Sequence, residues 1–181
     1  MHPASMLRMG AFVNKYLKDR SGLRVLDVGG QDINGTYKPL FADHRYEACD
    51  CHPGKNVDVV LSDPYDWIEY PDCSVDVVVC GQVLEHCEFD YLIVKQIGRV
   101  LRPGGLACII VPGSGPKHEE PDFRRYTDTA LRQITEMAGL QVLESDTGRV
   151  YSRWGDICVV AMKPALEEAA TIVRKSKGGS K

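Results

Sequence analysis

Four apolar runs in this chain of 181 residues end in glycine, acidic or amide residues, the types that bind polar small molecules. Gly29–Gln31 follow the first run and Gly81–Gln82 follow the fourth. Asp50 ends the second run, where a carboxylate can accept hydrogen bonds from both hydroxyls of a ribose. Asp63 ends the third run, where a carboxylate can accept a hydrogen bond from the exocyclic amine of adenine. Together these positions describe a groove shaped for a nucleoside.

The glycine-rich segment 23–35 has two interpretations when it is considered by itself. Glycine has no Cβ, so Gly29 and Gly30 let the backbone turn sharply and let a ligand approach closely. The alternative is a tight turn between a strand and a helix. Likewise, an acidic residue considered singly is more often a helix cap or a solvated loop carboxylate. A lone glycine-rich loop does not separate these interpretations, whereas its combination with Asp50 and Asp63 favours a binding loop.

The runs that carry these residues predict strands that alternate with helices. Apolar stretches with few polar breaks suit strands that are buried on both faces of a sheet. The first expected strand ends at residue 28, and the other six cover residues 45–49, 57–61, 75–80, 106–111, 140–144 and 156–162. The expected helices are one that stops near residues 21–22, a short segment over 37–42, a longer helix over 89–101, and one that begins at Thr127 and ends at Gly139.

This order of elements predicts an α/β fold with helices on both faces of a mostly parallel sheet of seven strands. The last two strands have no helix between them, so one of them should run antiparallel. We expect a single domain over residues 1–164, in which residues 1–22 form the N-terminal helix. Residues 165–181 are expected to be a C-terminal helix or flexible tail, with a basic, glycine- and serine-rich end.

Composition excludes several classes of function. Apolar residues make up 44% of the chain and charged residues 26%, as in ordinary globular proteins. The formal net charge of −3 gives no basic field that would attract nucleic acid or an anionic membrane. The sequence shows no secretory signal and no apolar run of about 20 residues that could span a membrane. We therefore predict a soluble, cytoplasmic protein for which a nucleic-acid partner is disfavoured.

The seven cysteines do not form the pattern of a disulfide framework, which fits a reducing compartment. Cys49, Cys51 and His52 lie close together and raise the question of a metal site. A second Cys/His pair at the spacing of a zinc finger is missing from the sequence. We therefore predict no metal.

Five motifs, in the right order over residues 24–162, resemble those of the class I S-adenosylmethionine-dependent methyltransferases, in particular the small Rossmann-like enzymes of methyltransferase type 11. They are the glycine-rich motif Val-Leu-Asp-Val-Gly-Gly at 25–30, the ribose-binding acid Asp50, the adenine-side loop Ser-Asp-Pro at 62–64, the fourth-strand motif with its Leu-Glu-His ending at 75–86, and the turn Val-Leu-Arg-Pro-Gly-Gly-Leu at 100–106. The specificity of this resemblance comes from the set rather than from any single motif.

The resemblance implies a Rossmann-like fold and the cofactor S-adenosyl-L-methionine, with S-adenosyl-L-homocysteine as the product. The residues expected to bind it are Asp27, Gly29, Gly30, Gln31, Gly35, Asp50, Cys51, Ser62, Asp63, Pro64, Cys80, Gly81 and Gln82. The chain departs from the family at Gln31, where a second glycine is usual, and Asp32 follows. Polar side chains thereby move toward the methionine end of the cofactor.

Residues 112–127 follow the fifth strand and resemble the segment His-x-x-Pro-x-x-x-Arg-Tyr/Phe-Thr of methyltransferases from glycan and secondary-metabolite pathways. His86 and His118 are the candidate catalytic bases for a hydroxyl acceptor. His86 has an alternative role, in which it packs or hydrogen-bonds under the loop. For Asp122 and Arg125 we favour an ion pair that anchors the loop over direct catalysis.

The resemblance favours O-methylation of a sugar, a glycan or a small secondary metabolite. Residues 80–83 read Cys-Gly-Gln-Val and lack the Asn/Asp-Pro-Pro-aromatic motif that is typical of amino-group methylation. One alternative is a non-catalytic module that binds S-adenosylmethionine and regulates a partner. A second is an NAD-dependent oxidoreductase, which the absence of Gly-x-Gly-x-x-Gly disfavours. A homodimer in which the neighbour completes the pocket also remains open.

Overall fold

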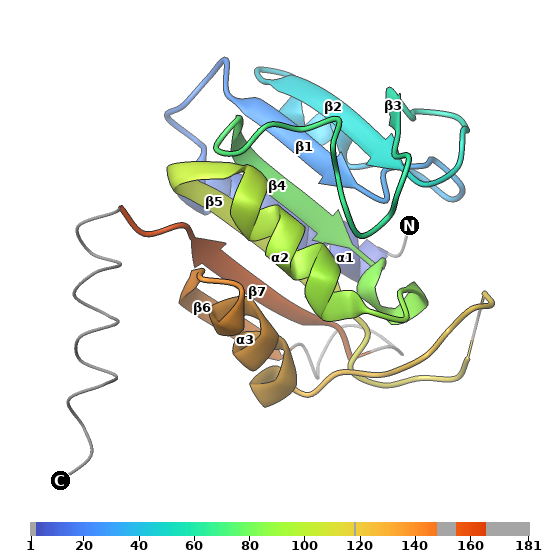
Figure 1. Cartoon of the computed structure of the whole chain (residues 1–181). Helices are drawn as coiled ribbons and strands as arrows, with labels where there is room; N and C mark the ends of the chain where they lie inside the picture. Colours follow the sequence, from blue (N-terminus) through green and yellow to red (C-terminus); the bar gives the residue numbers. More distant parts are fainter. Residues whose placement is uncertain (1–2, 118, 148–154, 166–181) are drawn as a thin grey trace, which may run out of the picture.

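The computed structural model describes residues 3–117, 119–147 and 155–165, and in them seven strands form one sheet (Figure 1). The order of strands across the sheet is β3-β2-β1-β4-β5-β7-β6. The strands are β1 (Arg24–Val28), β2 (Arg45–Asp50), β3 (Val59–Val60), β4 (Val75–Gly81), β5 (Leu101–Val111), β6 (Gln141–Thr147) and β7 (Ile157–Met162). Neighbouring strands from β3 to β5 are parallel, whereas β7 is antiparallel to both β5 and β6. The predicted fold class, with its antiparallel last strand, is confirmed.

Helices cover both faces of this sheet (Figure 1). Helix α1 (Pro3–Tyr16) packs on one face, where its Met9 and Phe12 join Val25 and Val77 in one buried cluster. Helices α2 (Asp90–Val100) and α3 (Asp128–Met137) cover the opposite face (Figure 1). Two short 3₁₀ helices, η1 (Lys38–Phe41) and η2 (Leu84–His86), follow β1 and β4 along the chain.

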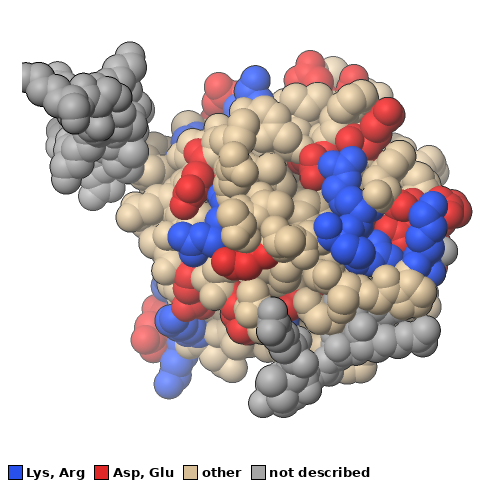
Figure 2. Space-filling view, turned by 90° about the horizontal axis from the view of Figure 1, so that it is seen from below, with Lys and Arg blue, Asp and Glu red and all other residues tan. Residues whose placement is uncertain are grey.

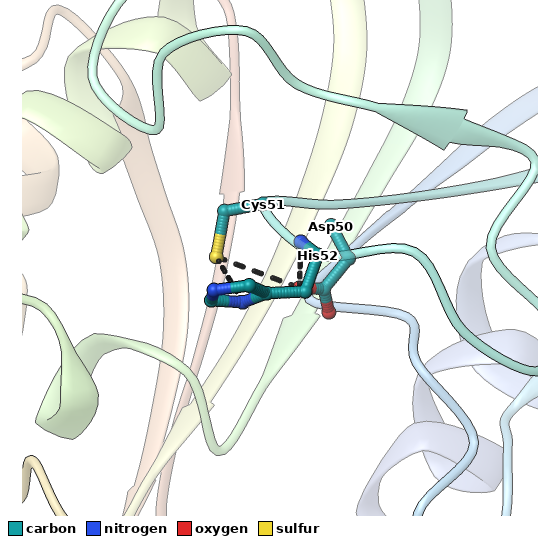
Figure 3. Close-up of side chains that lie close together, drawn as sticks. All are labelled: Asp50, Cys51 and His52. Atoms are coloured by element: carbon teal, nitrogen blue, oxygen red, sulfur yellow. Dashed lines mark hydrogen bonds between the residues drawn. The ribbon is translucent and has the colours of Figure 1, made fainter.

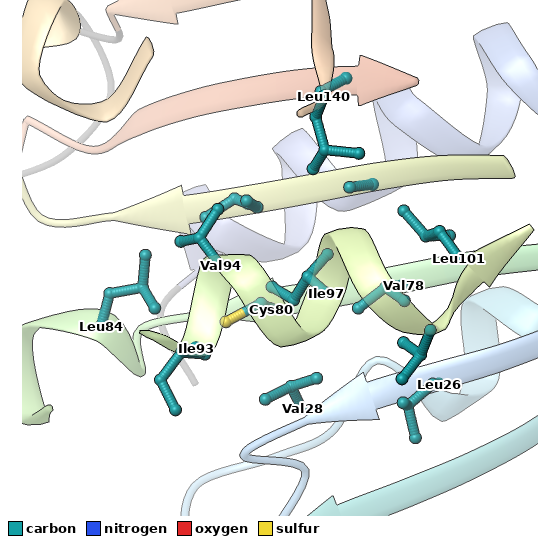
Figure 4. Packing of buried hydrophobic residues seen from close by; sticks show 14 of the residues in the cluster. Leu26, Val28, Val78, Cys80, Leu84, Ile93, Val94, Ile97, Leu101 and Leu140 are labelled. Atoms are coloured by element: carbon teal, nitrogen blue, oxygen red, sulfur yellow. The ribbon is translucent and has the colours of Figure 1, made fainter. Parts of the chain in front are cut away.

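The period-2 alternation of strand side chains explains why the apolar runs are nearly continuous. Leu26 and Val28 of β1 point to the face that α2 covers, where Ile93 and Ile97 complete the cluster (Figure 4). Val25 precedes them in sequence and belongs to the cluster under α1. Each central strand therefore buries both of its faces, as expected for a parallel sheet between two layers of helices.

Helices α2 and α3 begin and end within a few residues of their predicted bounds, whereas α1 ends at Tyr16 instead of near residues 21–22. The caps of α3 explain where it begins and ends. The side chain of Thr127 accepts a hydrogen bond of 3.1 Å from the backbone N–H of Ala130, which makes Thr127 the N-cap. Gly139 follows the helix with a φ of +81°, the left-handed conformation that suits glycine. Both assignments from the sequence are confirmed.

The third and fifth strands differ from their predicted lengths. Strand β3 contains only Val59–Val60 instead of residues 57–61, because it lies at the sheet edge and pairs with β2 alone. Strand β5 begins at Leu101 instead of residue 106. Its first residues leave the regular ladder, since the register with β4 shifts between Val75 and Val77.

Among the helices that the structure describes, none combines the length and the hydrophobicity that a membrane span requires. The single domain over residues 1–164 stays a prediction. Residues 166–181 of the expected tail lie outside the described residues.

Candidate active site

The carboxyl ends of the central strands meet at one edge of the sheet (Figure 1). Val28 pairs with Cys49 of β2 on one side and with Cys80 of β4 on the other. The residues after these three strand positions therefore leave the sheet side by side. Strand order reverses between β1 and β4, and such a switch point is where open α/β sheets bind ligands. The topology thus brings the glycine loop (residues 29–35), Asp50 and the Gly81–Gln82 turn to one place.

The glycine loop needs its two adjacent glycines for different reasons. Gly29 has a φ of +68°, and a Cβ on it would clash with the side chain of Val83. A Cβ on Gly30 would lie 2.7 Å from the Cβ of Ala48. The backbone N–H groups of Gly29 and Gly30 both donate to the carbonyl of Cys49, over 2.9 and 3.1 Å. The loop therefore lies tightly between β2 and the segment after β4.

Asp50 ends β2 as a half-buried carboxylate and faces this loop. Its Oδ2 lies 3.4 Å from the backbone N–H of Gln31, and its Oδ1 lies 3.2 Å from the backbone N–H of His52 (Figure 3). A carboxylate has about four acceptor positions, so these long bonds leave it able to accept hydrogen bonds from two ribose hydroxyls. Asp50 is therefore where the sequence predicts the ribose-binding acid to be.

Cys51 and His52 converge with Asp50, and the ligand atoms of the three lie within 4.8 Å of one another (Figure 3). Cys51 Sγ is 3.2 Å from Nδ1 of His52. Burial, followed by the neighbouring Asp50 carboxylate, raises the pKa of the Cys51 thiol. In the part of the chain that the structure describes, no other group of at least three His, Cys, Asp or Glu residues has its ligand atoms this close together.

The structure accounts for Gln31, the position at which the sequence departs from the family pattern. The side chain of Gln31 lies directly over Gly54, where a Cβ would clash with its amide. Close by, the side chain of Asn56 donates a hydrogen bond of 2.8 Å to the carbonyl of Gly30. The loop after β2 thus packs against the glycine loop, and Gln31 fills the space that Gly54 leaves open.

Asp32 and Gly35 extend the packing between the glycine loop and the loop after β2. Gly35 donates its backbone N–H to Asp32 Oδ1 over 2.8 Å, and Lys55 forms an ion pair of 2.6 Å with Asp32 Oδ2. The Lys55 ammonium and the Gly35 N–H hold the pKa of the half-buried Asp32 carboxyl below its usual value. Asp32 therefore fixes the turn at Gly35, which is itself exposed.

Ser62, Asp63 and Pro64 form an exposed turn after β3. Asp63 Oδ1 accepts a hydrogen bond of 2.7 Å from the backbone N–H of Tyr65. The carbonyl of Pro64 accepts one of 2.8 Å from the indole of Trp67. The turn is thus anchored from below by a buried tryptophan. Asp63 takes part in the local turn, as the solvated-loop alternative expects, and it keeps further acceptor positions for a ligand.

Gln82, directly after β4, has a buried side-chain amide nitrogen for which the described residues supply no partner. Cys80 is fully buried in the core, so only its backbone can reach a ligand (Figure 4). Gly81 lies against the hydroxyl of Tyr37, where a Cβ would clash. Gln82 has a φ of +60°, and its backbone N–H donates to the carbonyl of Ile110 over 2.8 Å. Its Nε2 is buried and has no hydrogen-bond partner within the described residues.

Asp27 lies beneath the glycine loop and is 3% exposed. Burial raises the pKa of its carboxyl to about 7, against the opposing effect of the hydrogen bond that Tyr46 donates to Oδ2. The Asp50 carboxylate raises that pKa further. Asp27 therefore supports the loop from inside the sheet, and the structure does not expose it to a ligand.

Asp27 should make the stability of the protein depend on pH. Its native pKa of about 7 exceeds the ordinary value of 3.8, so the native state binds the proton more tightly than the unfolded state. This stabilisation is fully present below about pH 4 and is lost as the pH rises through about 7. We expect the stability advantage of Asp27→Asn over the wild type to grow between pH 5 and pH 7.5 and then to level off. Urea unfolding at stepped pH values measures it, and a difference that is constant with pH contradicts the prediction.

The segment after β5 is anchored at the same edge by ion pairs. Asp122 is buried and accepts a two-pronged contact from the guanidinium of Arg125, with distances of 2.5 and 2.7 Å. Arg124 pairs with Asp90 at the start of α2 over 2.8 Å, and Tyr126 donates to the same carboxylate over 2.7 Å. These contacts agree with the loop-anchoring interpretation of Asp122 and Arg125. On the face seen from below, basic side chains likewise stand next to acidic ones (Figure 2).

Removing one partner of the Asp122–Arg125 pair should destabilise the fold. We expect Asp122→Asn to lower the free energy of unfolding by about 3 kcal/mol, because it leaves a half-buried guanidinium without its carboxylate. Asp72→Asn is the matched control, since Asp72 pairs with Arg99 over 2.7 Å but is 75% exposed, and we expect a change of at most about 1 kcal/mol. Urea unfolding at pH 7 measures both, and equal effects would show that the loop pair has no special weight.

His86 ends η2 and lies against the segment after β5 (residues 112–127), called the loop below. Its Nδ1 is 2.6 Å from the carbonyl of Pro121, and since a carbonyl only accepts, Nδ1 carries the hydrogen. Its Nε2 lies 3.8 Å from Oε1 of Glu85, too far for a hydrogen bond. The His86 side chain is 27% exposed. The other predicted base, His118, lies outside the described residues.

Comparison with known proteins places these features in a family. The sequence family described as a methyltransferase domain matches residues 20–109. A probable S-adenosylmethionine-dependent methyltransferase of Mycolicibacterium smegmatis is 30% identical over 128 residues, which cover 65% of this chain and 46% of that protein. The chain therefore spans about half the length of this curated relative.

Solved structures share the fold at low sequence identity. A Burkholderia thailandensis 1,6-didemethyltoxoflavin-N1-methyltransferase, solved with 1,6-didemethyltoxoflavin and S-adenosylhomocysteine, superposes with a TM-score of 0.71 at 19% identity, covering 90% of this chain and 79% of that one. An S-adenosylmethionine-dependent methyltransferase of Aquifex aeolicus gives a TM-score of 0.62 at 21% identity, covering 90% and 99% of the two chains. At these identities the likeness concerns the fold alone.

Proposed function

Because this chain belongs to the class I S-adenosylmethionine-dependent methyltransferases, whose cofactor is S-adenosyl-L-methionine, we propose that it methylates a hydroxyl group of a sugar, a glycan or a small secondary metabolite. The observation that carries the proposal is the convergence of the glycine loop, Asp50 and the buried Gln82 amide at one sheet edge. The cofactor supplies an activated methyl group on a sulfonium, so the protein mainly has to orient the reactants and enclose them.

The residues at this edge fit such a cofactor. Asp50 would accept hydrogen bonds from the ribose hydroxyls, and Asp63 would accept one from the adenine amine. Gly29 and Gly30 would face the amino-acid end, where their missing Cβ atoms allow close approach. The unpartnered Nε2 of Gln82 would donate to a carboxylate or hydroxyl oxygen of the ligand. The roles of Asp50, Asp63 and Gln82 each use an atom whose hydrogen-bonding capacity the described residues leave partly or wholly unfilled.

His86 is our first candidate for the general base. The hydrogen bond from Nδ1–H to Pro121 selects the neutral tautomer with its lone pair on Nε2. That nitrogen would take the proton of the acceptor hydroxyl as the oxygen attacks the methyl carbon, a contribution of about 10²–10⁴ in rate. His118 is the second candidate for the same role.

Oxygen is the preferred acceptor atom because of the residues at the end of β4. Cys80–Val83 supply no asparagine or aspartate side chain and no proline pair of the kind that amino-group methylation typically uses. A histidine base suits a hydroxyl, whose proton must leave as the methyl group arrives. These arguments support a hydroxyl acceptor and leave the sugar, glycan and metabolite classes to the experiment.

Calorimetric titration with S-adenosylhomocysteine and with NAD tests the proposal. We expect binding of the first in the micromolar range and no binding of the second. Failure to bind S-adenosylhomocysteine at high micromolar concentration would overturn the proposal. Transfer of labelled methyl groups from S-adenosylmethionine into glycan and metabolite extracts then tests activity. Binding without any transfer would favour the non-catalytic, regulatory module instead.

A further inference from the structure

Glu85 is a buried carboxylic acid that the proposed chemistry has not yet used. It lies in η2 between the end of β4 and His86, and its side chain is 0% exposed. Among the other described residues, none donates a hydrogen bond to its carboxyl oxygens, and only its own backbone N–H acts on them. A buried carboxyl normally has its oxygens hydrogen-bonded, because burial without a partner is costly. An exception of this kind, one residue from a candidate base, requires a functional explanation.

The backbone around Glu85 fixes its position relative to the loop. The carbonyl of Glu85 accepts a hydrogen bond of 2.8 Å from the backbone N–H of Phe123. The next residue, His86, donates from Nδ1 to the carbonyl of Pro121. Two successive residues of η2 are thus tied to two nearby residues of the loop. This arrangement holds Nε2 of His86 at 3.8 Å from Oε1 of Glu85.

Charged and titratable groups from several elements surround the Glu85 carboxyl. They are His86 and Cys87 beside it, Cys80 of β4, Asp122, Arg125 and Tyr126 of the loop, and Asp156 directly before β7. Arg125 forms its two-pronged contact with Asp122, so its positive charge offsets the charge of Asp122 before that of Glu85. Burial raises the pKa of Glu85 to about 8. The carboxylates of Asp122 and Asp156 also raise it, and the guanidinium of Arg125 lowers it.

We propose that Glu85 is a positioning residue for His86, whose carboxylate stabilises the imidazolium that forms when His86 accepts the proton of the methyl acceptor. This inference rests on the proposed function and extends it to a second residue. In the step itself, the acceptor O–H bond breaks and its proton goes to Nε2 of His86. The acceptor oxygen bonds to the methyl carbon as the bond from sulfur to that carbon breaks. Glu85 exchanges no atom and acts through its charge, since two unit charges at this distance interact strongly away from water.

Proton NMR of the His86 ring tests the coupling without an acceptor or a cofactor. We expect the Cε1–H resonance of His86, assigned by its loss in His86→Gln, to show an inflection near pH 8 as Glu85 ionises. Glu85→Gln keeps the shape of the side chain, cannot ionise, and should abolish that inflection. The resonance of His44, which lies directly before β2 and so at the opposite end of that strand from Asp50, serves as the control in both proteins. A wild-type His86 resonance without the inflection, or an inflection that survives in Glu85→Gln, would overturn the proposal.

Two further measurements separate this proposal from the proposed function. Wild type and Glu85→Gln should bind S-adenosylhomocysteine with dissociation constants within about twofold of each other, because Glu85 is not among the residues assigned to the cofactor above. If neither binds it while the inflection is present, the proposed function fails and the Glu85–His86 coupling stands. With an acceptor in hand, Glu85→Gln should lower kcat about 10- to 100-fold, leave KM nearly unchanged and remove the rise in activity through pH 8. A fall in KM and kcat together, with an unchanged pH profile, would indicate a merely structural role. If Glu85→Gln does not fold, the wild-type inflection alone decides.

Discussion

Asp50→Ala should raise the dissociation constant of S-adenosylhomocysteine by about 100-fold. Asp50 stands at the carboxyl end of β2, beside the glycine loop, and its oxygens accept only long hydrogen bonds: Oδ1 from the His52 N–H at 3.2 Å and the Cys51 thiol at 3.6 Å, and Oδ2 from the Gln31 N–H at 3.4 Å. Two ribose hydroxyls would make the shorter, charge-assisted bonds that such an oxygen pair accepts. Hydrogen bonds to a charged group contribute about 1.5–3 kcal/mol each, and about 2.7 kcal/mol corresponds to about 100-fold in affinity. Calorimetric titration at pH 7.5 measures the change.

Three further variants define this prediction. Asp50→Asn keeps one acceptor oxygen and should lose about 10-fold in affinity, between the wild type and alanine. Asp63→Ala should also lose about 10-fold, because Asp63 is exposed and one of its oxygens serves the turn at Tyr65. Asp66→Ala removes an exposed acid from the same segment and is the matched control. Wild-type affinity in Asp50→Ala would remove the ribose contact from the site.

Local sequence patterns predicted most of what positions this site. The apolar runs placed β1, β2 and β4, and the glycine, acid and amide residues after them meet at one edge as expected. The missing helix between the last two strands predicted the antiparallel β7. Both inferences depend on chain neighbours or on the rules that connect successive elements, so the sequence alone carries them.

The features that the sequence did not predict depend on contacts between distant segments. The packing of Gln31 over Gly54 requires the loop after β2 to fold back on the glycine loop, and no periodic pattern records that approach. Glu85 looks like an exposed acid in a short helical turn. It is nevertheless buried, and the charged groups that act on its carboxyl come from the loop after β5 and from Asp156 before β7, both far along the chain. A signal was available in the sequence, since Leu-Glu-His adjoins a strand end, but charge alone did not reveal a buried position.

His86→Ala should lower kcat by about 10²–10⁴-fold and leave the affinity for S-adenosylhomocysteine within about twofold of the wild type. The imidazole lies after β4 at the sheet edge, and its Nδ1–H bond to Pro121 leaves Nε2 as the basic nitrogen. General-base catalysis contributes a factor of this size to a hydroxyl acceptor. The measurement is initial-rate kinetics of methyl transfer with the acceptor that the labelling screen identifies, alongside calorimetry. Loss of His118 should act similarly if that residue is the base instead.

His86→Ala also removes the hydrogen bond to Pro121, so a displaced loop could lower kcat as well. His86→Asn separates the two causes, because its amide N–H can take the place of Nδ1–H while it offers no basic nitrogen in the position of Nε2. If His86 is the base, His86→Asn should remain as slow as His86→Ala even though the loop is held. If His86→Asn recovers wild-type turnover, His86 only holds the loop, as the alternative interpretation of the sequence proposed. His44→Ala, which removes a histidine away from this edge, should leave kcat unchanged and controls for general effects of the substitution.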